Sequence, residues 1–104
     1  MKPIIITPGE ILLEDYLKQM NISPATLAHE IGVSVHAINE IIAGRQKISP
    51  EISLRLGVFF KQDARFWYNI QATCDFQKIK AEQKKITVKR NYEELLSSLL
   101  PASV

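Results

Sequence analysis

Polar and charged side chains suited to contacting a nucleic acid gather between Ser23 and Lys47. Asparagine can pair with adenine through two atoms, glutamate can accept from cytosine, and an apolar group can contact the thymine methyl. Serine, histidine and the cationic side chains can bind bases or phosphate oxygens. The candidates for base contact are Ser34, Val35, His36, Asn39 and Glu40, and the candidates for phosphate contact are Ser23, Arg45 and Lys47.

Two short apolar-periodic segments must position these side chains. Apolar residues recur at helical spacing, first at Leu27, Ala28 and Ile31 and then at Ile38, Ile41 and Ile42. Gly32 lies between the segments and favours the left-handed backbone that ends a helix, and Ser34 is a candidate N-cap for the second helix. The pattern predicts a helix-turn-helix, whose second helix enters the DNA major groove.

The local pattern leaves alternatives open. Many small helical proteins contain a helical hairpin bent at a glycine, and the polar residues of this one would then form a solvated face. Asn39 and Glu40 could instead fix the loop that follows. Arg45 and Lys47 could simply be solvated charges that keep that loop soluble.

Composition narrows the class of protein. The chain has 104 residues and 46% hydrophobic residues, as expected of one globular domain with a tail. No apolar run reaches the roughly 20 residues that span a bilayer, and the single cysteine, Cys74, excludes an internal disulfide, so we expect a cytoplasmic protein. His29 and His36 lack metal-ligand spacing, and we find no catalytic triad or phosphate loop, so we expect no metal, no cofactor and no enzyme.

The net charge of +2 is unevenly distributed. Through Phe60 there are five basic and six acidic residues, and from Lys61 onward there are eight basic and five acidic residues. Because phosphate contacts supply much of DNA affinity, a DNA-reading half that is not basic overall favours a dimer with two copies of each contact.

Three further helices flank the central pair. The first is expected from Pro8 to Met20, the fourth from Pro50 and the fifth, capped by Asp63, from about Ala64 to Lys80. The expected buried stripe of the first helix is Ile11, Leu12, Tyr16, Leu17 and Met20, and the expected core residues of the fourth are Ile52, Leu54, Leu56, Val58, Phe59 and Phe60. On the fifth helix, Phe66, Trp67, Ile70 and Cys74 are candidates for a dimer or partner interface, with burial in the core as the alternative.

The composition changes after about residue 80. We therefore divide the chain into a helix-turn-helix domain with a dimerisation helix (1–80) and a basic tail (81–104). The basic residues from Lys78 to Arg90 suit a solvated face, phosphate contacts or a docking surface. Ile86–Val88 alternates as a short strand would, and Asn91 starts a leucine-rich helix that ends before Pro101.

The chain resembles the HigA-type (VapI-like) antitoxins of the Cro/repressor-like (XRE) helix-turn-helix superfamily. The matching residues are Pro8-Gly9-Glu10-Ile11-Leu12, Leu27-Ala28, Ile31-Gly32-Val33-Ser34, Ile38-Asn39-Glu40-Ile41, Gly44-Arg45, Leu54-Arg55-Leu56, Phe66-Trp67, Asn69 and Gln71. The resemblance covers roughly Thr7 to Lys78 and leaves out the lysine-rich tail and the final helix.

The resemblance implies an all-α, five-helix, lambda-repressor-like domain, here with a C-terminal extension. It implies a homodimer that dimerises through its C-terminal region, binds a palindromic operator in double-stranded DNA, represses its own operon and neutralises a cognate mRNA-cleaving toxin. A regulator without a toxin partner and a protein-binding module that does not bind DNA remain the alternatives.

Overall fold

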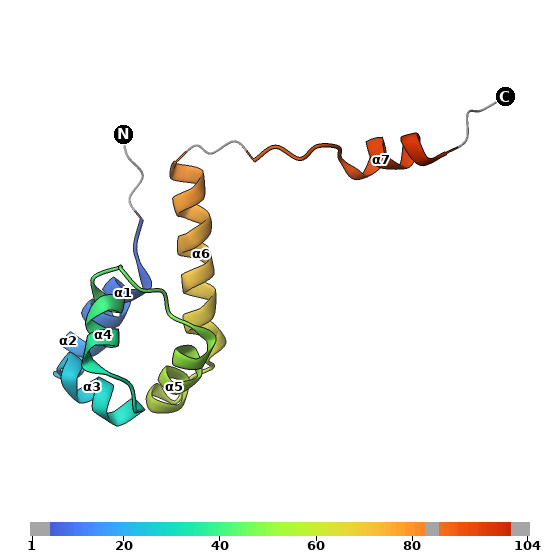
Figure 1. The fold of residues 1–104 in the computed structure, drawn as a ribbon. Coiled ribbons are helices and arrows are strands. Elements are labelled where there is room, and N and C mark those ends of the chain that lie inside the picture. The colour runs from blue at the N-terminus through green and yellow to red at the C-terminus, as the bar shows by residue number, and fades with distance from the viewer. Residues whose placement is uncertain (1–4, 83–85, 101–104) are drawn as a thin grey trace.

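The computed structural model describes residues 5–82 and 86–100. The elements are α1 (Pro8–Ile11), η1 (Leu12–Leu17), α2 (Lys18–Met20), α3 (Pro24–Ile31), α4 (Val35–Ile42), α5 (Pro50–Phe60), α6 (Arg65–Ala81) and α7 (Tyr92–Leu99). Over these ranges the chain forms helices and no strand, which confirms the predicted all-α class. Helices α1 to α5 pack beside the first half of α6, the rest of α6 extends beyond them, and α7 stands apart (Figure 1).

Side-chain caps begin most of the helices. Thr7, Ser23, Ser34 and Ser49 each accept a hydrogen bond from the backbone N–H three residues later, at 3.0–3.2 Å. Proline occupies the first turn of α1, α3 and α5, where its missing N–H has no intrahelical partner in any case. Helix α3 ends at Gly32, whose φ of 76° is the predicted left-handed backbone.

The first helix is continuous from Pro8 to Met20, but its middle six residues, η1, have π-helical geometry. In this segment hydrogen bonds join residues five apart, as in the bond from the Lys18 N–H to the Leu13 carbonyl. Leu12 and Leu17, which are five apart, therefore face the same side and are both buried. The prediction that Met20 is buried is wrong: the shifted register leaves its side chain 49% exposed.

The core joins α1–η1, α3, α4, α5 and α6. Its members are Leu12, Leu17, Leu27, Ala28, Ile31, Ile38, Ile41, Ile48, Ile52, Leu56 and Trp67. Gly9 allows α1 to approach α4 closely, since a Cβ at this position would overlap the Ile41 carbonyl. Ala28 is buried on α3, which packs against α4.

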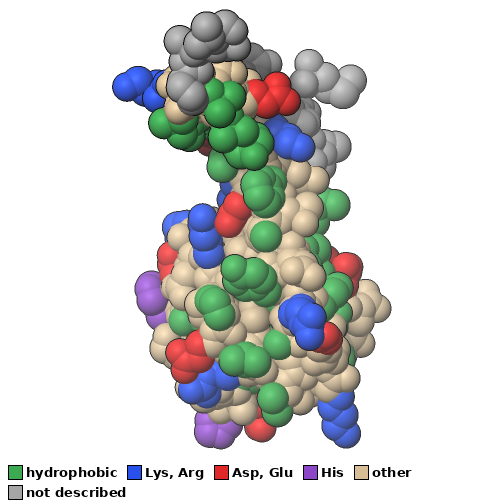
Figure 2. Space-filling model, turned by 90° about the vertical axis from the view of Figure 1, so that its right-hand side faces the viewer, with side chains coloured by type: hydrophobic (Ala, Val, Ile, Leu, Met, Phe, Trp, Pro, Cys, Tyr) green, Lys and Arg blue, Asp and Glu red, His purple; other side chains and the backbone are tan. Residues whose placement is uncertain are grey.

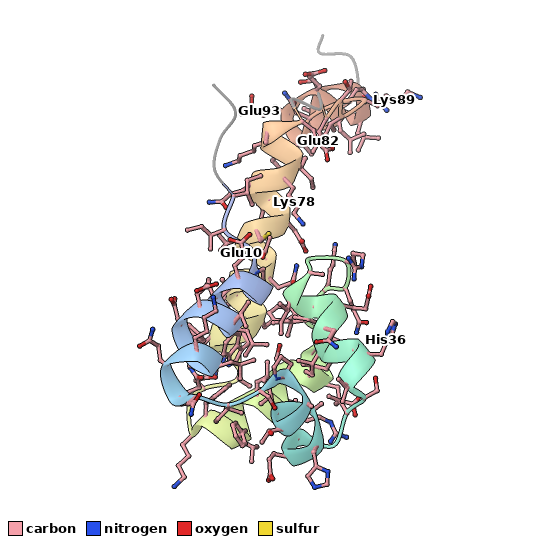
Figure 3. The ribbon with its side chains drawn as sticks, turned by 90° about the vertical axis from the view of Figure 1, so that its left-hand side faces the viewer. Glu10, His36, Lys78, Glu82, Lys89 and Glu93 are labelled. Carbon is pink, nitrogen blue, oxygen red and sulfur yellow. The ribbon has the colours of Figure 1, made fainter. Side chains whose placement is uncertain are left out.

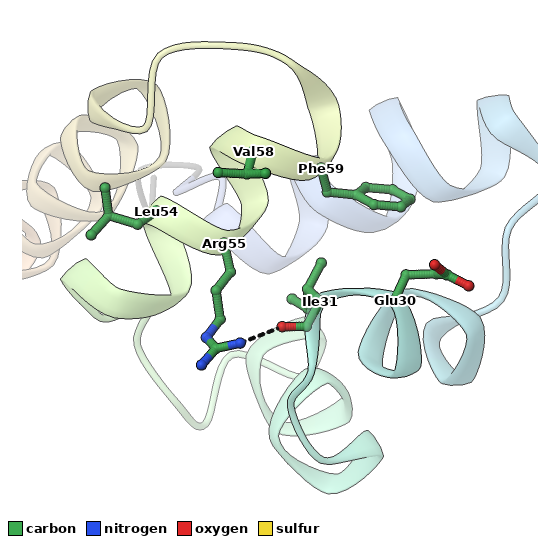
Figure 4. Close-up of a pocket in the computed structure, with 6 residues that line it drawn as sticks. All are labelled: Glu30, Ile31, Leu54, Arg55, Val58 and Phe59. Atoms are coloured by element: carbon green, nitrogen blue, oxygen red, sulfur yellow. Dashed lines mark hydrogen bonds between the residues drawn. The ribbon is translucent and has the colours of Figure 1, made fainter.

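The apolar residues of α5 do not all lie in the core. Ile52 and Leu56 are buried, but Leu54 and Val58 are 63% and 80% exposed, so the prediction that these two belong to the core is wrong. Helix α5 carries apolar residues around most of its circumference, and only one face can be directed at α3 and α6. Leu54 and Val58 instead line a shallow groove of about 360 Å³ with Ile31 and Phe59 (Figure 4).

The C-terminal segment is built differently. Helix α6 runs from Arg65 to Ala81, close to its predicted bounds, with the Asp63 carboxylate accepting from the Arg65 N–H at 2.9 Å. The strand predicted for 86–88 is absent, because these residues are exposed and pair with no other described segment. Asn91 caps α7 through the Glu94 N–H at 2.8 Å, as predicted, and Pro101 lies outside the described residues.

Candidate nucleic-acid interface

Helix α4 is anchored by one face and presents the other to solvent. Ile38 and Ile41 on its inner face are fully buried. Val35, His36 and Asn39 on the outer face are exposed, as is Ser34 just before the helix, and His36 points away from the body (Figure 3). The structure therefore brings four of the five candidate base-reading side chains onto one exposed surface.

The serine caps differ in their remaining hydrogen-bonding capacity. Ser34 accepts from the Ala37 N–H at 3.0 Å and its hydroxyl proton has no acceptor among the described residues. Ser23 accepts from the Thr26 N–H and also donates its hydroxyl proton to the Thr26 hydroxyl at 2.9 Å. At the start of α3 the Thr26 hydroxyl, rather than that of Ser23, thus retains a proton to donate.

Glu40 and Arg45 form a bidentate ion pair across the end of α4. The Arg45 Nε and Nη2 atoms donate to the two Glu40 carboxylate oxygens at 2.9 and 2.8 Å. The Arg45 and Gln46 N–H groups also donate to the Glu40 carbonyl, so both parts of Glu40 hold the loop. Hydrogen bonding to Arg45 lowers the pKa of Glu40 below its ordinary value, and the same pair raises the pKa of Arg45.

A second network ties the same loop to α6. The buried Gln71 side chain accepts from the Ile48 N–H at 2.8 Å and donates to Asp75 at 3.0 Å. Asp75 in turn pairs with Lys47 at 3.3 Å. Lys47 remains 73% exposed, so its ammonium group stays accessible from solvent. Gln71 is one of the residues that match the antitoxin family, but no pattern in the sequence predicted its hydrogen bonds to Ile48 and Asp75.

Arg55 fixes the other end of the helix-turn-helix. Its Nη1 donates to the Ile31 carbonyl at 2.7 Å, close to where α3 ends (Figure 4). Its Nη2 pairs with Glu51 at 3.0 Å. This contact satisfies a carbonyl in the last turn of α3 and joins α3 to α5. The two helices of the motif are therefore held from both sides, by α5 at Ile31 and by α6 at Ile48.

Two candidate interface residues lie inside the chain. Trp67 and Cys74 are 0% and 1% exposed, so they have no surface to offer a partner, and their assignment to an interface is wrong. The Trp67 ring packs against the tilted ring of Tyr16, with centroids 4.9 Å apart, and its indole N–H donates to Gln62 at 3.2 Å. Phe66 is 39% exposed and Ile70 is half-buried, so these two can contribute contact area.

Other kinds of site were also considered. Residues 5–82 and 86–100 hold no group of three or more histidine, cysteine or acidic side chains placed to bind a metal ion. Among the helices of those ranges, none has the length and hydropathy needed to span a membrane. The exposed face of α4 and its loop is therefore the candidate site that the geometry favours.

Comparison with known proteins points in the same direction. A family model described as helix-turn-helix matches residues 13–65. Virulence-associated protein I of Dichelobacter nodosus is 39% identical over 83 residues, which cover 80% of this chain and 77% of that protein.

Two solved structures are similar over most of their length. The antitoxin HigA of Pseudomonas aeruginosa, solved with the higBA promoter, has a TM-score of 0.74 and 29% identity, and the match covers 97% of this chain and 100% of that one. The antitoxin GraA, in complex with its operator, has a TM-score of 0.73 and 28% identity, covering 100% of this chain and 97% of that one. Since the family model spans half of the sequence and lies across the α3–α4 motif, the chain belongs to the helix-turn-helix family.

Proposed function

We propose that this protein is a DNA-binding antitoxin of a toxin–antitoxin system, which acts in the cytoplasm. It represses its own operon and neutralises a partner toxin that cleaves mRNA. The observation that carries the proposal is the exposed face of α4, held rigidly by the buried Ile38 and Ile41. The similarity to two antitoxins solved with promoter or operator DNA supports both the DNA target and the antitoxin role.

Each exposed group receives a role in this proposal. Asn39 pairs with a base, Val35 contacts a thymine methyl, and Ser34 and His36 donate to a base or phosphate. Lys47 and the first turn of α3, with Ser23 and Thr26, bind the phosphate backbone. Glu40 and Arg45 act mainly by shaping the loop, although Arg45 is exposed enough to contact a phosphate at the same time.

A homodimer on a palindromic operator fits the distribution of charge. Up to Phe60 acidic residues slightly outnumber basic ones, so a single copy offers few cations to the DNA phosphates. Two copies double those contacts and place two α4 helices in successive major grooves, one helical turn apart. The partly exposed Phe66 and Ile70 are available for contacts in such a dimer.

The proposed DNA binding is tested by a mobility shift on the DNA upstream of the protein's own gene. We expect Asn39→Ala to weaken operator binding by about 1–3 kcal/mol, and Lys47→Ala to weaken binding to all DNA and reduce the salt dependence. Asn69→Ala, an exposed residue on α6, is the matched control. If the unaltered protein binds this DNA no more tightly than random DNA, the repressor role is excluded.

The proposed antitoxin role is tested with the protein encoded by the adjacent gene. We expect a small ribonuclease whose toxicity disappears, and whose RNA cleavage stops, when this protein is co-expressed. A regulator without a toxin partner would bind the operator but leave the neighbouring product active. The protein-binding alternative would do the reverse, with complex formation and no salt-sensitive DNA affinity. Catalysis is not part of the proposal, because the matched family consists of DNA-binding proteins and not of enzymes.

A further inference from the structure

A groove of about 480 Å³ runs between the first helix and α6. Ile70, Thr73 and Gln77 of α6 line one wall, at the spacings of three and four that place side chains on one helix face. The other wall is formed by α1 and η1, and Ile6, just before α1, also lines the groove. Its apolar side chains are Ile6, Ile11 and Ile70. We call this surface the α1–α6 groove.

Three carboxylates lie along the first-helix wall of this groove, and they belong to Glu10, Glu14 and Asp15. In a regular α-helix Glu10 and Asp15, which are five residues apart, would be separated by about 140° around the axis. The π-helical register brings residues five apart toward the same side, as it does for Leu12 and Leu17, and both carboxylates line the groove. Figure 3 shows Glu10 beside α6. The irregular first helix therefore concentrates negative charge at a partly apolar surface.

Two of these carboxylates are not neutralised by a neighbouring cation. Lys18 pairs with Glu14 at 2.8 Å, and both side chains are more than half exposed. Glu10 and Asp15 form no ion pair with any residue in the ranges 5–82 and 86–100. These two carboxylates are therefore available to a cationic partner.

The α6 wall adds little charge to the groove. Lys80 lies one helical turn beyond Gln77 and is the cation of α6 closest to the groove. The other charged residues near this end of α6 are rotated by about 100–160° around its axis from Gln77 and lie on other sides of the helix; they are Asp75, Lys78 and Glu82. A groove with two unpaired carboxylates and one lysine beyond its end is acidic overall.

The charge of the groove decides which partner fits it. Nucleic acid does not fit, because carboxylates repel phosphates. A second copy of this chain is disfavoured, because a symmetric contact would place the carboxylates of both copies against each other. The side of α6 turned away from the body specifies no partner, since Figure 2 shows acidic and basic side chains interspersed among its hydrophobic ones. The α1–α6 groove matches a cationic protein segment that also carries apolar side chains.

We propose that the α1–α6 groove binds the partner toxin through a cationic, partly apolar segment of that protein. The inference rests on the proposed function and names the surface that holds the toxin. A protein that cleaves mRNA must bind RNA phosphates and therefore presents lysine and arginine side chains. Glu10 and Asp15 pair with these cations, while Ile6, Ile11 and Ile70 contact the apolar side chains beside them. The cations of the toxin are then withheld from RNA.

The groove is separate from the proposed DNA-binding surface. None of its lining residues belongs to α4 or to the loop after it, and Figure 3 shows His36 on the outer side of α4, away from Glu10. We therefore expect one chain to hold the toxin and the operator at the same time. Of the two residues available for dimer contacts, Ile70 is assigned to the toxin and Phe66 remains for the dimer.

The acidic wall is tested by titrating the full-length protein with the purified protein encoded by the adjacent gene, at several salt concentrations. We expect the double substitution Glu10→Gln and Asp15→Asn to raise the dissociation constant about tenfold at low salt and to reduce its salt dependence. The matched control, Glu93→Gln and Glu94→Gln, removes two charges from exposed residues of α7 and should leave the constant unchanged. Equal effects of the two double variants would show that only net charge matters and would overturn the inference.

The apolar part of the groove is tested by a pair of single substitutions. Ile6→Ser changes a side chain that is 56% exposed in the α1–α6 groove, and Leu54→Ser changes one that is 63% exposed in the groove between α3 and α5. Because both positions are exposed, both variants should fold. We expect Ile6→Ser to raise the dissociation constant about threefold or more and Leu54→Ser to leave it unchanged. The reverse result would place the toxin in the α3–α5 groove and overturn the inference.

A photochemical cross-link identifies the occupant directly. With p-benzoylphenylalanine in place of the exposed Gln77, we expect an adduct with the protein encoded by the adjacent gene. An adduct with a second copy or with residues 86–90, or no adduct in an intact complex, would overturn the inference. If that protein binds but the groove variants keep their affinity, the inference fails and the proposed function stands. If it does not bind at all, the proposed antitoxin role fails as well.

Discussion

The two ends of α6 belong to differently built regions. Around its first half, the packed helices bury Trp67, Leu12 and Ile38 completely, and side-chain hydrogen bonds tie the end of α3 to α5 and the loop after α4 to α6. Beyond residue 75, Phe76, Ile79 and all of α7 are exposed. The first region is stabilised by its own core, whereas the second has the apolar pattern of a packed helix but no packing partner among residues 5–82 and 86–100. A comparison of the effects of substitution in the two regions separates folding from assembly.

The largest effect is expected from Trp67. Trp67→Ala removes a fully buried aromatic side chain together with its hydrogen bond to Gln62, so we expect a loss of about 3–5 kcal/mol in the free energy of unfolding. Urea denaturation measures it. Ile86→Ser in the C-terminal segment, where Ile86 is 77% exposed, should change the same quantity by less than about 0.5 kcal/mol. Comparable losses at both positions would show that the two regions form one folding unit.

Gly9 tests how closely the packed region must fit. A Cβ at this position overlaps the Ile41 carbonyl, so Gly9→Ala must push α1 and α4 apart. We expect a cost of about 1–3 kcal/mol, as for other overpacked sites, and weaker operator binding because α4 moves. Thermal unfolding and the mobility shift measure the two effects. Stability and operator affinity equal to those of the unaltered protein would contradict the close approach.

Gln71 tests the attachment of the α4 loop to α6. Gln71→Met keeps much of the volume but leaves the buried Ile48 N–H without an acceptor, at an expected cost of about 1–3 kcal/mol. Asn69→Ala, two residues away and exposed, is the control. Amide hydrogen exchange at Ile48 should accelerate in Gln71→Met and stay slow in the control. Unchanged exchange at Ile48 would show that the loop is held by other contacts.

The smallest effect concerns the ion pair at the end of α4. Hydrogen bonding to Arg45 lowers the pKa of Glu40, so Arg45→Gln should raise that pKa toward the ordinary value of 4.5. A depressed pKa means that the pair stabilises the fold above this value and that the contribution is lost as the pH falls through the lowered pKa. NMR titration of the Glu40 carboxyl measures the shift. Because the Arg45 side of the pair is 66% exposed, we expect the free energy of unfolding at neutral pH to change little. An identical Glu40 pKa in both proteins would show that the pair does not persist in solution.

Much of the local structure was predictable because its causes are local. Ser23, Ser34 and Ser49 precede their helices by one residue and cap them, and Gly32 ends α3 with a positive φ. The alternation of buried and exposed residues along α4 follows from its periodicity alone. These features depend on residues a few positions apart, which is the range over which sequence patterns are reliable.

The tertiary structure decided the relations between distant residues. Leu54 and Trp67 are both large and apolar, yet only Trp67 is buried, because α6 packs one face on the core while α5 has more apolar surface than its neighbours cover. Met20 turned outward because a π-helical turn shifted its register, and Gln71 became the anchor of a loop 23 residues earlier in the chain. The sequence by itself determined where helices start, where they stop and which face of α4 is polar. Which apolar helix faces are buried was decided by the tertiary structure, because their burial depends on packing between segments far apart in the chain.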